Sequence, residues 1–185
     1  MNLSRSVFCL FIALAFLITS GCGYNLRAGG EPVGIEIKSL AIPMVKSSSS
    51  EKGFEPDFTT VLRNEFIRHA RVPLKNSGQA AMVLKVDVYE IATQPLTFDS
   101  AQNTVSGKTV TYETTSSRRL ILKLNVNLMD STTGKTVWSD ASMTEEASFD
   151  VTSDPLVNRK NQQEALLKIA GLLSKKIYNR TMERF

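Results

Sequence analysis

The chain has 185 residues, with 22 Lys and Arg against 18 Asp and Glu, and hydrophobic residues make up 42% of it. This length and composition suit a single domain with a sizeable core. The formal net charge of +4 is too small to indicate a nucleic-acid-binding protein.

A short apolar run opens the chain. Val7 to Ile18 follow the charged Arg5 and fall well short of the roughly 20 residues that cross a bilayer as a helix. They fit the core of a secretory signal instead. We therefore predict a signal peptide in residues 1–21, an N-terminal tether rich in Gly and Pro in 22–34, and one domain in 35–185.

A cysteine marks the end of this signal. Ser20 and Gly21 stand directly before Cys22, the arrangement at which bacterial lipoproteins are acylated and cut, although Thr19 occupies a position where an aliphatic residue is usual. Cys9 leaves with the signal, so the remaining thiol has no disulfide partner within the chain. We predict that Cys22 carries a lipid anchor. Ordinary signal-peptide cleavage and an uncleaved membrane anchor are the alternatives.

Apolar periodicity predicts the first elements of the domain. Ile35 to Val45 is typical of a strand, and Pro43 places its end at a sheet edge or a strand terminus, because proline cannot donate to a ladder. Pro56 to Ala70 has apolar residues at steps of three and four, which predicts an amphipathic helix that ends before Pro73.

Three strands are predicted to follow. Met82–Tyr89 and Leu120–Leu128 alternate along their length, the pattern of strands with one buried face. Asp130–Lys135 is typical of a turn, after which Thr136–Asp150 returns antiparallel. Bulky residues occur at both parities of this last strand, so the pattern leaves open which side faces the core.

A polar, threonine-rich stretch, residues 93–117, lies between the second and third strands. It keeps a period of two around Tyr112, and Ser106-Gly107-Lys108 is a plausible turn. We predict a long hairpin that extends both strands past the core, because structureless loops of this length are unusual. A disordered excursion is the alternative.

Pro155 to Tyr178 is predicted to form the last helix, with an apolar stripe and basic residues near its C-terminus. Whether it continues toward Arg184 is left open. The elements then run strand, helix, three meandering strands, helix. This order favours an α+β fold, a two-layer sandwich in which two helices pack on one face of a sheet of about four strands.

Residues that could carry catalysis are sparse. His69 is the single histidine, on or beside the apolar face of the first predicted helix, where a core or boundary role is favoured. An enzyme would need it exposed in a cleft beside a carboxylate. No second His or spare Cys completes a metal site or a nucleophile pair, and the adjacent Glu145 and Glu146 fall on opposite faces of a strand. We expect a binding or scaffolding protein, without enzymatic activity or a cofactor.

The basic residues are more informative. Arg118 and Arg119 open the third strand, Lys108 lies at the tip of the hairpin, and Arg159 and Lys160 begin the last helix. A membrane-tethered domain faces anionic lipids, whose phosphates attract Lys and Arg. These five residues are a candidate cationic patch, and a merely solvated surface is the alternative.

The segment Ser20-Gly21-Cys22-Gly23-Tyr24-Asn25-Leu26-Arg27 resembles the lipobox and the residues that follow it in the LPS-assembly lipoprotein LptE family. The order of elements, the Leu120–Asp130 strand and the opening of the last helix at Asp154–Lys168 are also similar. The resemblance covers essentially the whole mature chain. The serine- and threonine-rich hairpin and Thr19 depart from the family pattern.

This resemblance implies a function. LptE-like proteins sit in the lumen of the LptD β-barrel, assist its folding, plug it and contact lipopolysaccharide on its way to the cell surface. Their basic positions for lipopolysaccharide lie in the hairpin and at the start of the last helix, which match Lys108 loosely and Lys160 better, with Arg159 beside it. Arg118 and Arg119 complete the candidate lipopolysaccharide-binding set.

Location and partners follow from the same resemblance. In enteric bacteria, an Asp directly after the acylated cysteine retains lipoproteins at the inner membrane. This chain has Gly23 at that position, and the absence of the Asp favours the outer membrane. We expect a lipid-anchored protein on the periplasmic face of that membrane, with an LptD-like barrel and lipopolysaccharide as partners and no nucleic acid. The alternative is a lipoprotein that regulates a cell-wall synthase or another envelope enzyme.

Overall fold

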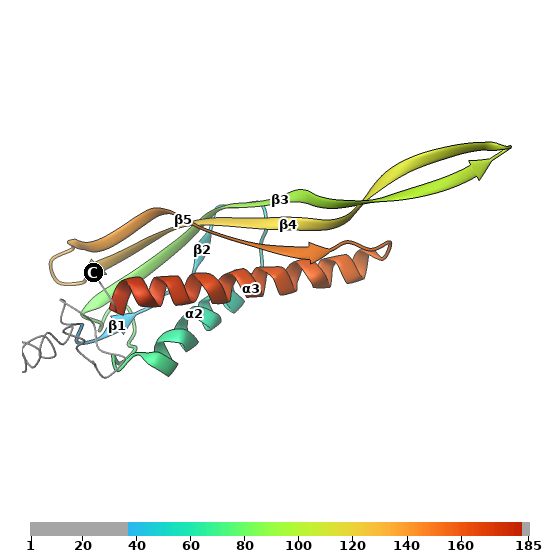
Figure 1. Cartoon of the computed structure of the whole chain (residues 1–185). Coiled ribbons are helices and arrows are strands. Elements are labelled where there is room, and N and C mark those ends of the chain that lie inside the picture. The colour runs from blue at the N-terminus through green and yellow to red at the C-terminus, as the bar shows by residue number, and fades with distance from the viewer. Residues whose placement is uncertain (1–36, 183–185) are drawn as a thin grey trace, which may run out of the picture.

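The computed structural model describes residues 37–182 (Figure 1). In chain order its elements are β1 (Leu40–Ala41), β2 (Lys46–Ser47), α2 (Glu55–His69), β3 (Met82–Val105), β4 (Lys108–Asp130), β5 (Thr136–Asp150) and α3 (Pro155–Met182). The predicted signal peptide, the acylation site Cys22 and the tether lie outside the described residues. Among the described residues, no helix is both long and apolar enough to cross a membrane.

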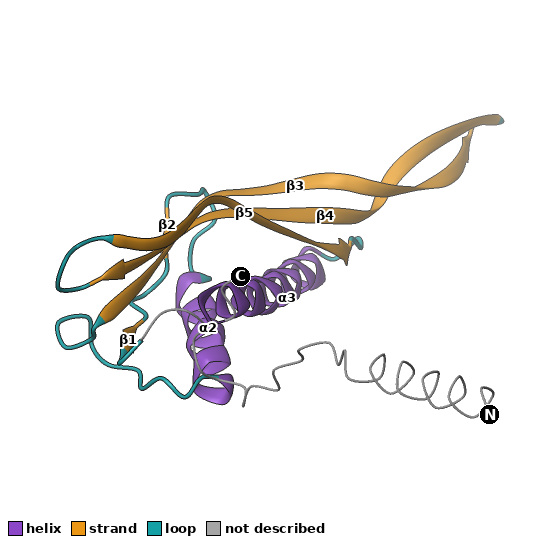
Figure 2. Cartoon of the chain, turned by 60° about the vertical axis from the view of Figure 1, so that its left-hand side comes forward, coloured by secondary structure: helices purple, strands orange, loops and turns teal. Residues whose placement is uncertain are grey.

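Both helices pack on one face of a single sheet, as Figure 2 shows. The sheet order is β1-β3-β4-β5, with β2 also paired to β3. The three long strands form an antiparallel meander, whereas β1 and β2 pair with β3 in parallel. The predicted two-layer α+β sandwich is confirmed. Its sheet has five strands because β2, which lies just after the first predicted strand, was not expected.

The first strand is much shorter than predicted, and the reason is visible in the structure. Only β1 falls within the predicted strand Ile35–Val45. The carbonyl oxygen of Ile42 accepts hydrogen bonds from Nε and Nη2 of Arg63 at 2.8 and 2.6 Å, and the amide of Val45 donates to a threonine of α2. These backbone groups bond to α2 instead of β3, and Pro43 has no amide hydrogen. A continuous strand is therefore the wrong prediction here, and Pro43 lies in the segment between β1 and β2.

The core lies between the inner face of the sheet and the two helices. Strand residues reach it at every second position and helix residues at steps of three and four. The largest fully buried side chains are Phe58, Phe66, Leu40, Leu62, Leu84, Leu120, Leu122, Leu124, Leu128, Ile169, Leu173 and Ile177. Each such side chain contributes roughly 1.5–3 kcal/mol of hydrophobic stabilisation.

The end of α2 is joined to α3 through Tyr178. Its ring lies edge-on to Phe66 at a centroid distance of 5.4 Å, and its Oη donates a hydrogen bond of 3.0 Å to the carbonyl of His69. The helix continues past Tyr178 as far as Met182, so it extends beyond the predicted minimum.

Strand β5 changes the parity of its buried residues part-way along. Trp138 is buried at one parity, and Met143 and Ala147 are buried at the other. The pairing with β4 shifts between Leu124 and Val126, with one extra residue on β5. This bulge turns the later side chains to the opposite face, which is why the sequence pattern alone did not settle which side of β5 is buried.

The turn between β4 and β5 forms where it is predicted. Oδ1 of Asp130 accepts hydrogen bonds from the amides of Thr132 and Thr133 at 2.8 and 2.7 Å. Gly134 has a φ of 68°, the left-handed region that glycine adopts at no steric cost. These contacts fix the register at the start of the β4–β5 pair.

Strands β3 and β4 continue beyond the other strands as a two-stranded ribbon, residues 98–115 (Figure 1). Eight residue pairs, from Phe98–Thr115 to Val105–Lys108, join its two arms, which corresponds to about 26 Å at 3.3 Å per residue. The predicted long hairpin is confirmed, and the disordered alternative is wrong.

A two-residue turn closes the ribbon. Ser106 and Gly107 have φ values of 52° and 75°, the left-handed pair that a type I′ turn requires. Because this turn matches the natural twist of the two strands, it holds the arms of the ribbon in register. The turn residues themselves were predicted from the sequence.

Candidate functional site

The first half of α3 borders two neighbouring cavities. One, of about 370 Å³, opens between the sheet and the start of the helix, and Arg118, Phe149 and Arg159 are among its lining residues. The other, of about 580 Å³, lies between α3 and the loop before α2. Arg159 and Gln162 line both cavities, so these two side chains form the boundary between them.

The start of α3 is held in place by side chains that bond to the end of β5. Oδ1 of Asp154 accepts a hydrogen bond from the amide of Leu156 at 2.8 Å and so caps the helix. Asn158 donates to the carbonyl and accepts from the amide of Thr152 at 2.9 and 2.7 Å. Asn161 donates to the carbonyl of the last β5 residue at 2.9 Å. Arg159 therefore projects from a fixed helix terminus.

Arg118 reaches the smaller cavity from the sheet. It continues the buried parity of Leu120 and Leu122 and is paired across the sheet with Phe149, so it lies on the helix-bearing face just past the edge of the core. Neither Arg118 nor Arg159 forms an ion pair with any residue in the described range 37–182. Both side chains are exposed.

The smaller cavity brings positive charge together without a neutralising acid. Its lining consists of Thr93, Arg118, Phe149, Val151, Pro155, Asn158, Arg159 and Gln162. Two guanidinium groups that line one cavity without an acidic lining residue favour an anion. A planar guanidinium also binds phosphate or carboxylate oxygens in pairs. The arrangement suits an anionic ligand.

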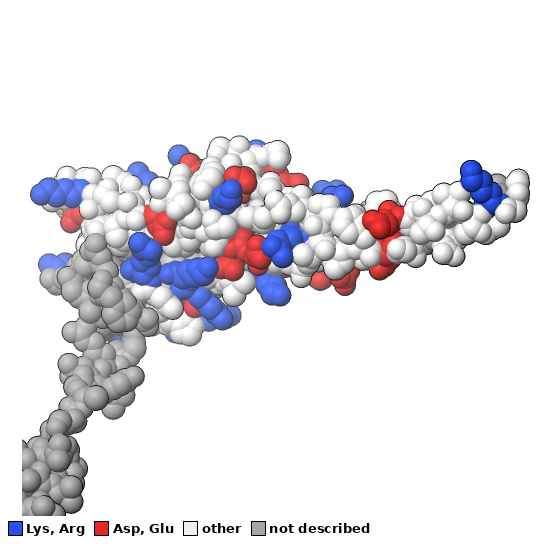
Figure 3. All heavy atoms as spheres, turned by 45° about the horizontal axis from the view of Figure 1, so that its top comes forward, with Lys and Arg blue, Asp and Glu red and all other residues white. Residues whose placement is uncertain are grey.

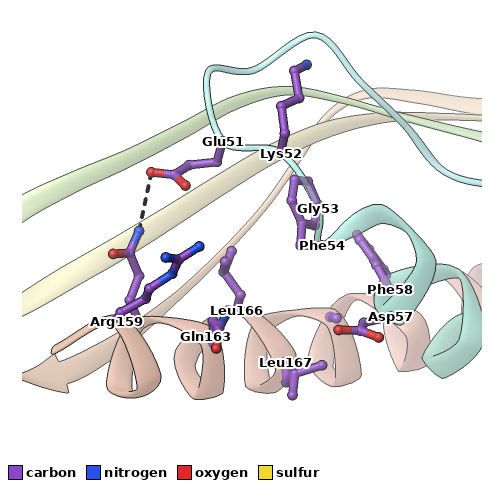
Figure 4. Close-up of a pocket in the computed structure, with 12 residues that line it drawn as sticks. Glu51, Lys52, Gly53, Phe54, Asp57, Phe58, Arg159, Gln163, Leu166 and Leu167 are labelled. Atoms are coloured by element: carbon purple, nitrogen blue, oxygen red, sulfur yellow. Dashed lines mark hydrogen bonds between the residues drawn. The ribbon is translucent and has the colours of Figure 1, made fainter. Parts of the chain in front are cut away.

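The larger cavity is mixed in character (Figure 4). Phe54 and Phe58 line it from the side of α2, and Leu166 from α3. Nε2 of Gln162 donates to Oε1 of Glu51 at 3.3 Å, the dashed contact in Figure 4. An apolar lining thus lies next to the arginine-lined cavity.

The other three predicted basic residues lie elsewhere. Lys108 lies at the far tip of the ribbon. Arg119 is on the outer sheet face, with Nη1 3.5 Å from Oε1 of Glu146. Nζ of Lys160 lies 3.6 Å from Oε1 of Glu164, one helical turn away. The five candidates therefore do not form one patch: only Arg118 and Arg159 share a cavity.

Charges of both signs are interspersed over the body of the domain, whereas the ribbon is nearly uncharged (Figure 3). Asp99, Lys108 and Glu113 are the charged residues between positions 98 and 115. The face shown in Figure 3 is thus not a broad cationic surface. The cavity with Arg118 and Arg159 is a local feature.

The residues weighed for catalysis are placed as follows. His69 is exposed at the end of α2, with Nε2 3.8 Å from Oε1 of Glu65, and it lines neither cavity. Of the two favoured roles, core or boundary, its exposure fits the boundary. Glu145 and Glu146 do lie on opposite faces, where they pair with Lys176 and Arg119 respectively. Among residues 37–182, no group of three or more His, Cys, Asp and Glu side chains could hold a metal ion.

Several lining residues were missed by sequence reasoning. Asn158 and Gln162 are one helical turn apart and frame Arg159, a spacing that places them on one side of α3. Thr93 pairs with Leu120 across the β3–β4 ladder, so its position beside the cavity can be derived only when the register of the two strands is known. The helix spacing was the available signal.

Comparisons with known proteins identify the fold. No family model matches the chain, and no curated protein matches its sequence. Lipoprotein B of Nitrosomonas europaea is similar in structure, with a TM-score of 0.50, 10% identity, and coverage of 87% of this chain and 91% of that chain. A minor lipoprotein of Acinetobacter baumannii has a TM-score of 0.45 at 15% identity, covering 80% and 93%. At these identities the first match shows a shared fold alone, and the second carries no argument.

Proposed function

We propose that this chain is an outer-membrane lipoprotein that partners and plugs an LptD-like β-barrel and assists the insertion of lipopolysaccharide into the outer membrane. The cavity lined by Arg118 and Arg159 supports this most directly. Lipid A carries phosphate groups, which paired guanidinium groups bind through charge-assisted, bidentate hydrogen bonds. Such side chains also compete with the divalent cations that bridge neighbouring lipopolysaccharides.

The surroundings of the cavity suit an amphiphile better than a free anion. Leu156 and Val157 are 78% and 40% exposed, and they precede Arg159 by three and two positions on α3. Leu156 therefore lies on the same helix face as Arg159. Leu166 adds apolar surface in the adjoining cavity. A phosphorylated headgroup attached to acyl chains would meet both kinds of surface.

The outer face of the sheet supports a position inside a polar lumen. Both helices leave this face uncovered (Figure 2). It carries ion pairs instead of an apolar patch: Nζ of Lys123 lies 3.0 Å from Oε2 of Glu90, and Arg119 pairs with Glu146. A sheet face of this kind requires water or polar partners, which the interior of a large barrel provides.

The lipid anchor is supported by the sequence before the domain. Cys22 follows Ser20 and Gly21 at the end of an apolar signal, and the chain shares its fold with a lipoprotein of Nitrosomonas europaea. Two or more acyl chains on Cys22 would anchor the protein stably, since one chain alone binds a membrane only marginally. Gly23 favours sorting to the outer membrane.

Isolation from the native envelope tests this function. The full chain, extracted in mild detergent with an affinity tag at its C-terminus, should co-purify with a large outer-membrane barrel identified by mass spectrometry. Lipopolysaccharide should be present in the same fraction. Isolation only as a free lipoprotein, or stimulation of a purified cell-wall synthase without any bound barrel, would contradict the proposal.

A Cys22→Ala variant provides the control for the anchor. We expect the wild-type N-terminal peptide to carry a diacylglyceryl thioether, which mass spectrometry detects directly. The variant should lack this group and lose its stable association with the outer membrane. Equal membrane retention of the two proteins would remove Cys22 from its assigned role.

A further inference from the structure

The two edges of the ribbon are open. The pairing of β5 with β4 ends at Asp150 and Ser117, and the amide of Val151 makes a last bond to the carbonyl of Ser116. Within the described residues, the β4 arm of the ribbon then pairs with β3 alone. Strand β2 pairs with β3 only as far as Val88, so the β3 arm of the ribbon has a free edge as well.

The geometry of the turn identifies which backbone groups face outward. Val105 and Lys108 close a two-residue turn and therefore form a hydrogen-bonded pair. Pairs then alternate along the ladder, so Thr109, Thr111 and Glu113 direct their N–H and C=O groups away from β3. The hydroxyl groups of Thr104 and Thr109 lie 3.0 Å apart. This contact agrees with the assignment of Thr104 and Thr109 as a non-hydrogen-bonded pair, because side chains approach most closely at such pairs.

These edges lack the features that usually prevent strand addition. Natural proteins block free edges with lysines, prolines, bulges or a covering element. The β4 arm from 108 to 115 has charged residues only at Lys108 and Glu113 and no proline, and its pairing with β3 is regular from Phe98 to Val105. Its residues are mainly Thr, Val and Tyr, which favour extended backbone.

Neither water nor a bilayer is the best environment for such a ribbon. A two-stranded hairpin without a core is marginally stable in water. Phe98 is 56% exposed, Val110 47% and Tyr112 43%, so apolar surface is left uncovered there. Insertion into lipid would bury that surface but would leave the edge N–H and C=O groups unsatisfied, at several kcal/mol each. A further β-strand satisfies both requirements.

We infer that the ribbon binds a strand of the β-barrel partner by β-augmentation, with the strand added along the β4 edge in line with β5. The eight-pair length of the ribbon is close to the 9–11 residues of a membrane-spanning barrel strand. Main-chain hydrogen bonds supply the affinity in this mode, and they tolerate varied side chains. A barrel strand whose own edge stays unpaired offers the complementary partner.

Because this inference rests on the proposed function, its test starts from the wild-type chain with its barrel. Thr111→Pro removes one outward N–H while leaving the hydrogen bonds between β3 and β4 in place, because edge prolines are tolerated where the amide faces away. We expect barrel co-purification to fall about fivefold or more, because the variant loses one net hydrogen bond and misaligns the adjacent hydrogen bond to the added strand. Thr111→Ala keeps the amide and should change co-purification less than twofold.

A photo-crosslinking amino acid in place of Thr109 provides an independent readout. It should yield a product with the barrel, and peptide mapping should place the product on a barrel strand. Denaturant unfolding of Thr111→Pro should match that of wild type, since the core lies outside the ribbon.

The outcomes separate the two ideas. Wild-type co-purification that Thr111→Pro leaves unchanged overturns the strand addition and leaves the proposed function standing. Crosslinks from position 109 that reach only a second copy of this chain, or only lipid, also overturn it. If the wild-type chain binds no barrel at all, the proposed function fails, and strand addition to the barrel fails with it.

Discussion

Arg118 of β4 and Arg159 of α3 come from opposite layers of the sandwich and line one cavity. The sheet parity that buries Leu120 carries Arg118 to the helix-bearing face. The bonds from Asn158 to Thr152 fix the start of α3 above it. The placement of both arginines at one cavity thus depends on how the two layers meet, and it links the core packing to the candidate binding site.

Replacing both arginines should weaken lipopolysaccharide binding strongly. Hydrogen bonds to charged groups contribute about 1.5–3 kcal/mol each, so we expect Arg118→Glu combined with Arg159→Glu to reduce affinity by tenfold or more. A titration of the detergent-solubilised full chain with purified lipopolysaccharide measures this. The change should be smaller in high salt, because part of the attraction is screened.

Two matched variants keep this prediction specific. Lys108→Glu lies at the ribbon tip, and Arg119→Glu lies on the outer sheet face beside Glu146. Each changes the net charge by as much as one of the cavity variants does, and each should alter affinity less than twofold. If either weakened binding as much as Arg159→Glu alone, general electrostatic attraction would explain the binding better than the cavity.

Sequence reasoning identified both arginines but not their relationship. The alternation predicted for Leu120–Leu128 already places Arg118 at the buried parity and Arg119 at the other. It does not show that the start of α3 lies beside that end of β4, because this is a contact between elements far apart in the sequence. The grouping of five residues into one patch was too coarse because charge alone carries no direction.

The fold was predicted more completely, for a physical reason. The hairpin, the last helix and the Leu120–Leu128 strand follow from local periodicity and turn chemistry, which short segments encode by themselves. The early end of the first strand depends on Arg63 bonding to Ile42, and the facing of β5 depends on a bulge. Both are tertiary effects that local pattern does not contain.

Two adjacent leucines of α3 offer a direct test of the core. Leu173 is fully buried, at 0% exposure, and Leu172 is 37% exposed. Leu173→Ala should lower the free energy of unfolding by about 2–5 kcal/mol, since it removes buried methyl groups and leaves a cavity. Leu172→Ala should cost less than about 1 kcal/mol. Urea unfolding of both variants measures the difference, and equal losses would contradict the assigned helix orientation.

Asp130 should make stability depend on pH in the acid range. The amides of Thr133 and Thr132 donate to its carboxylate and lower its pKa below the ordinary value of 3.8. The ionised form is thus favoured in the folded state, so its contribution is complete above pH 3.8 and is lost as the pH falls through the folded pKa. Asp130→Asn should be less stable than wild type at neutral pH, and the two should converge in acid. Parallel unfolding curves between pH 2 and 7, run at the same salt concentration, measure this; a difference that persists at pH 2 would contradict it.

The turn at the ribbon tip should control local opening of the ribbon without affecting the body. Ser106 and Gly107 both have positive φ. Asn is favoured over Ser at the first such position, so Ser106→Asn should slow hydrogen exchange of the ribbon amides about twofold or more. Gly107→Ala should accelerate it about fivefold, since a Cβ in the left-handed region costs roughly 1–2 kcal/mol. Apart from Gly107 itself and its two chain neighbours, no heavy atom lies within 4 Å of the position that the Cβ of the Gly107→Ala variant would take, so this effect would come from the backbone alone. Exchange at Leu122, which is buried in the body, should be the same in all three proteins, because the ribbon extends past the core and its opening exposes none of that residue. If the two variants changed exchange at Leu122 as much as in the ribbon, the ribbon and the body would unfold as one cooperative unit, and the turn would be part of global stability.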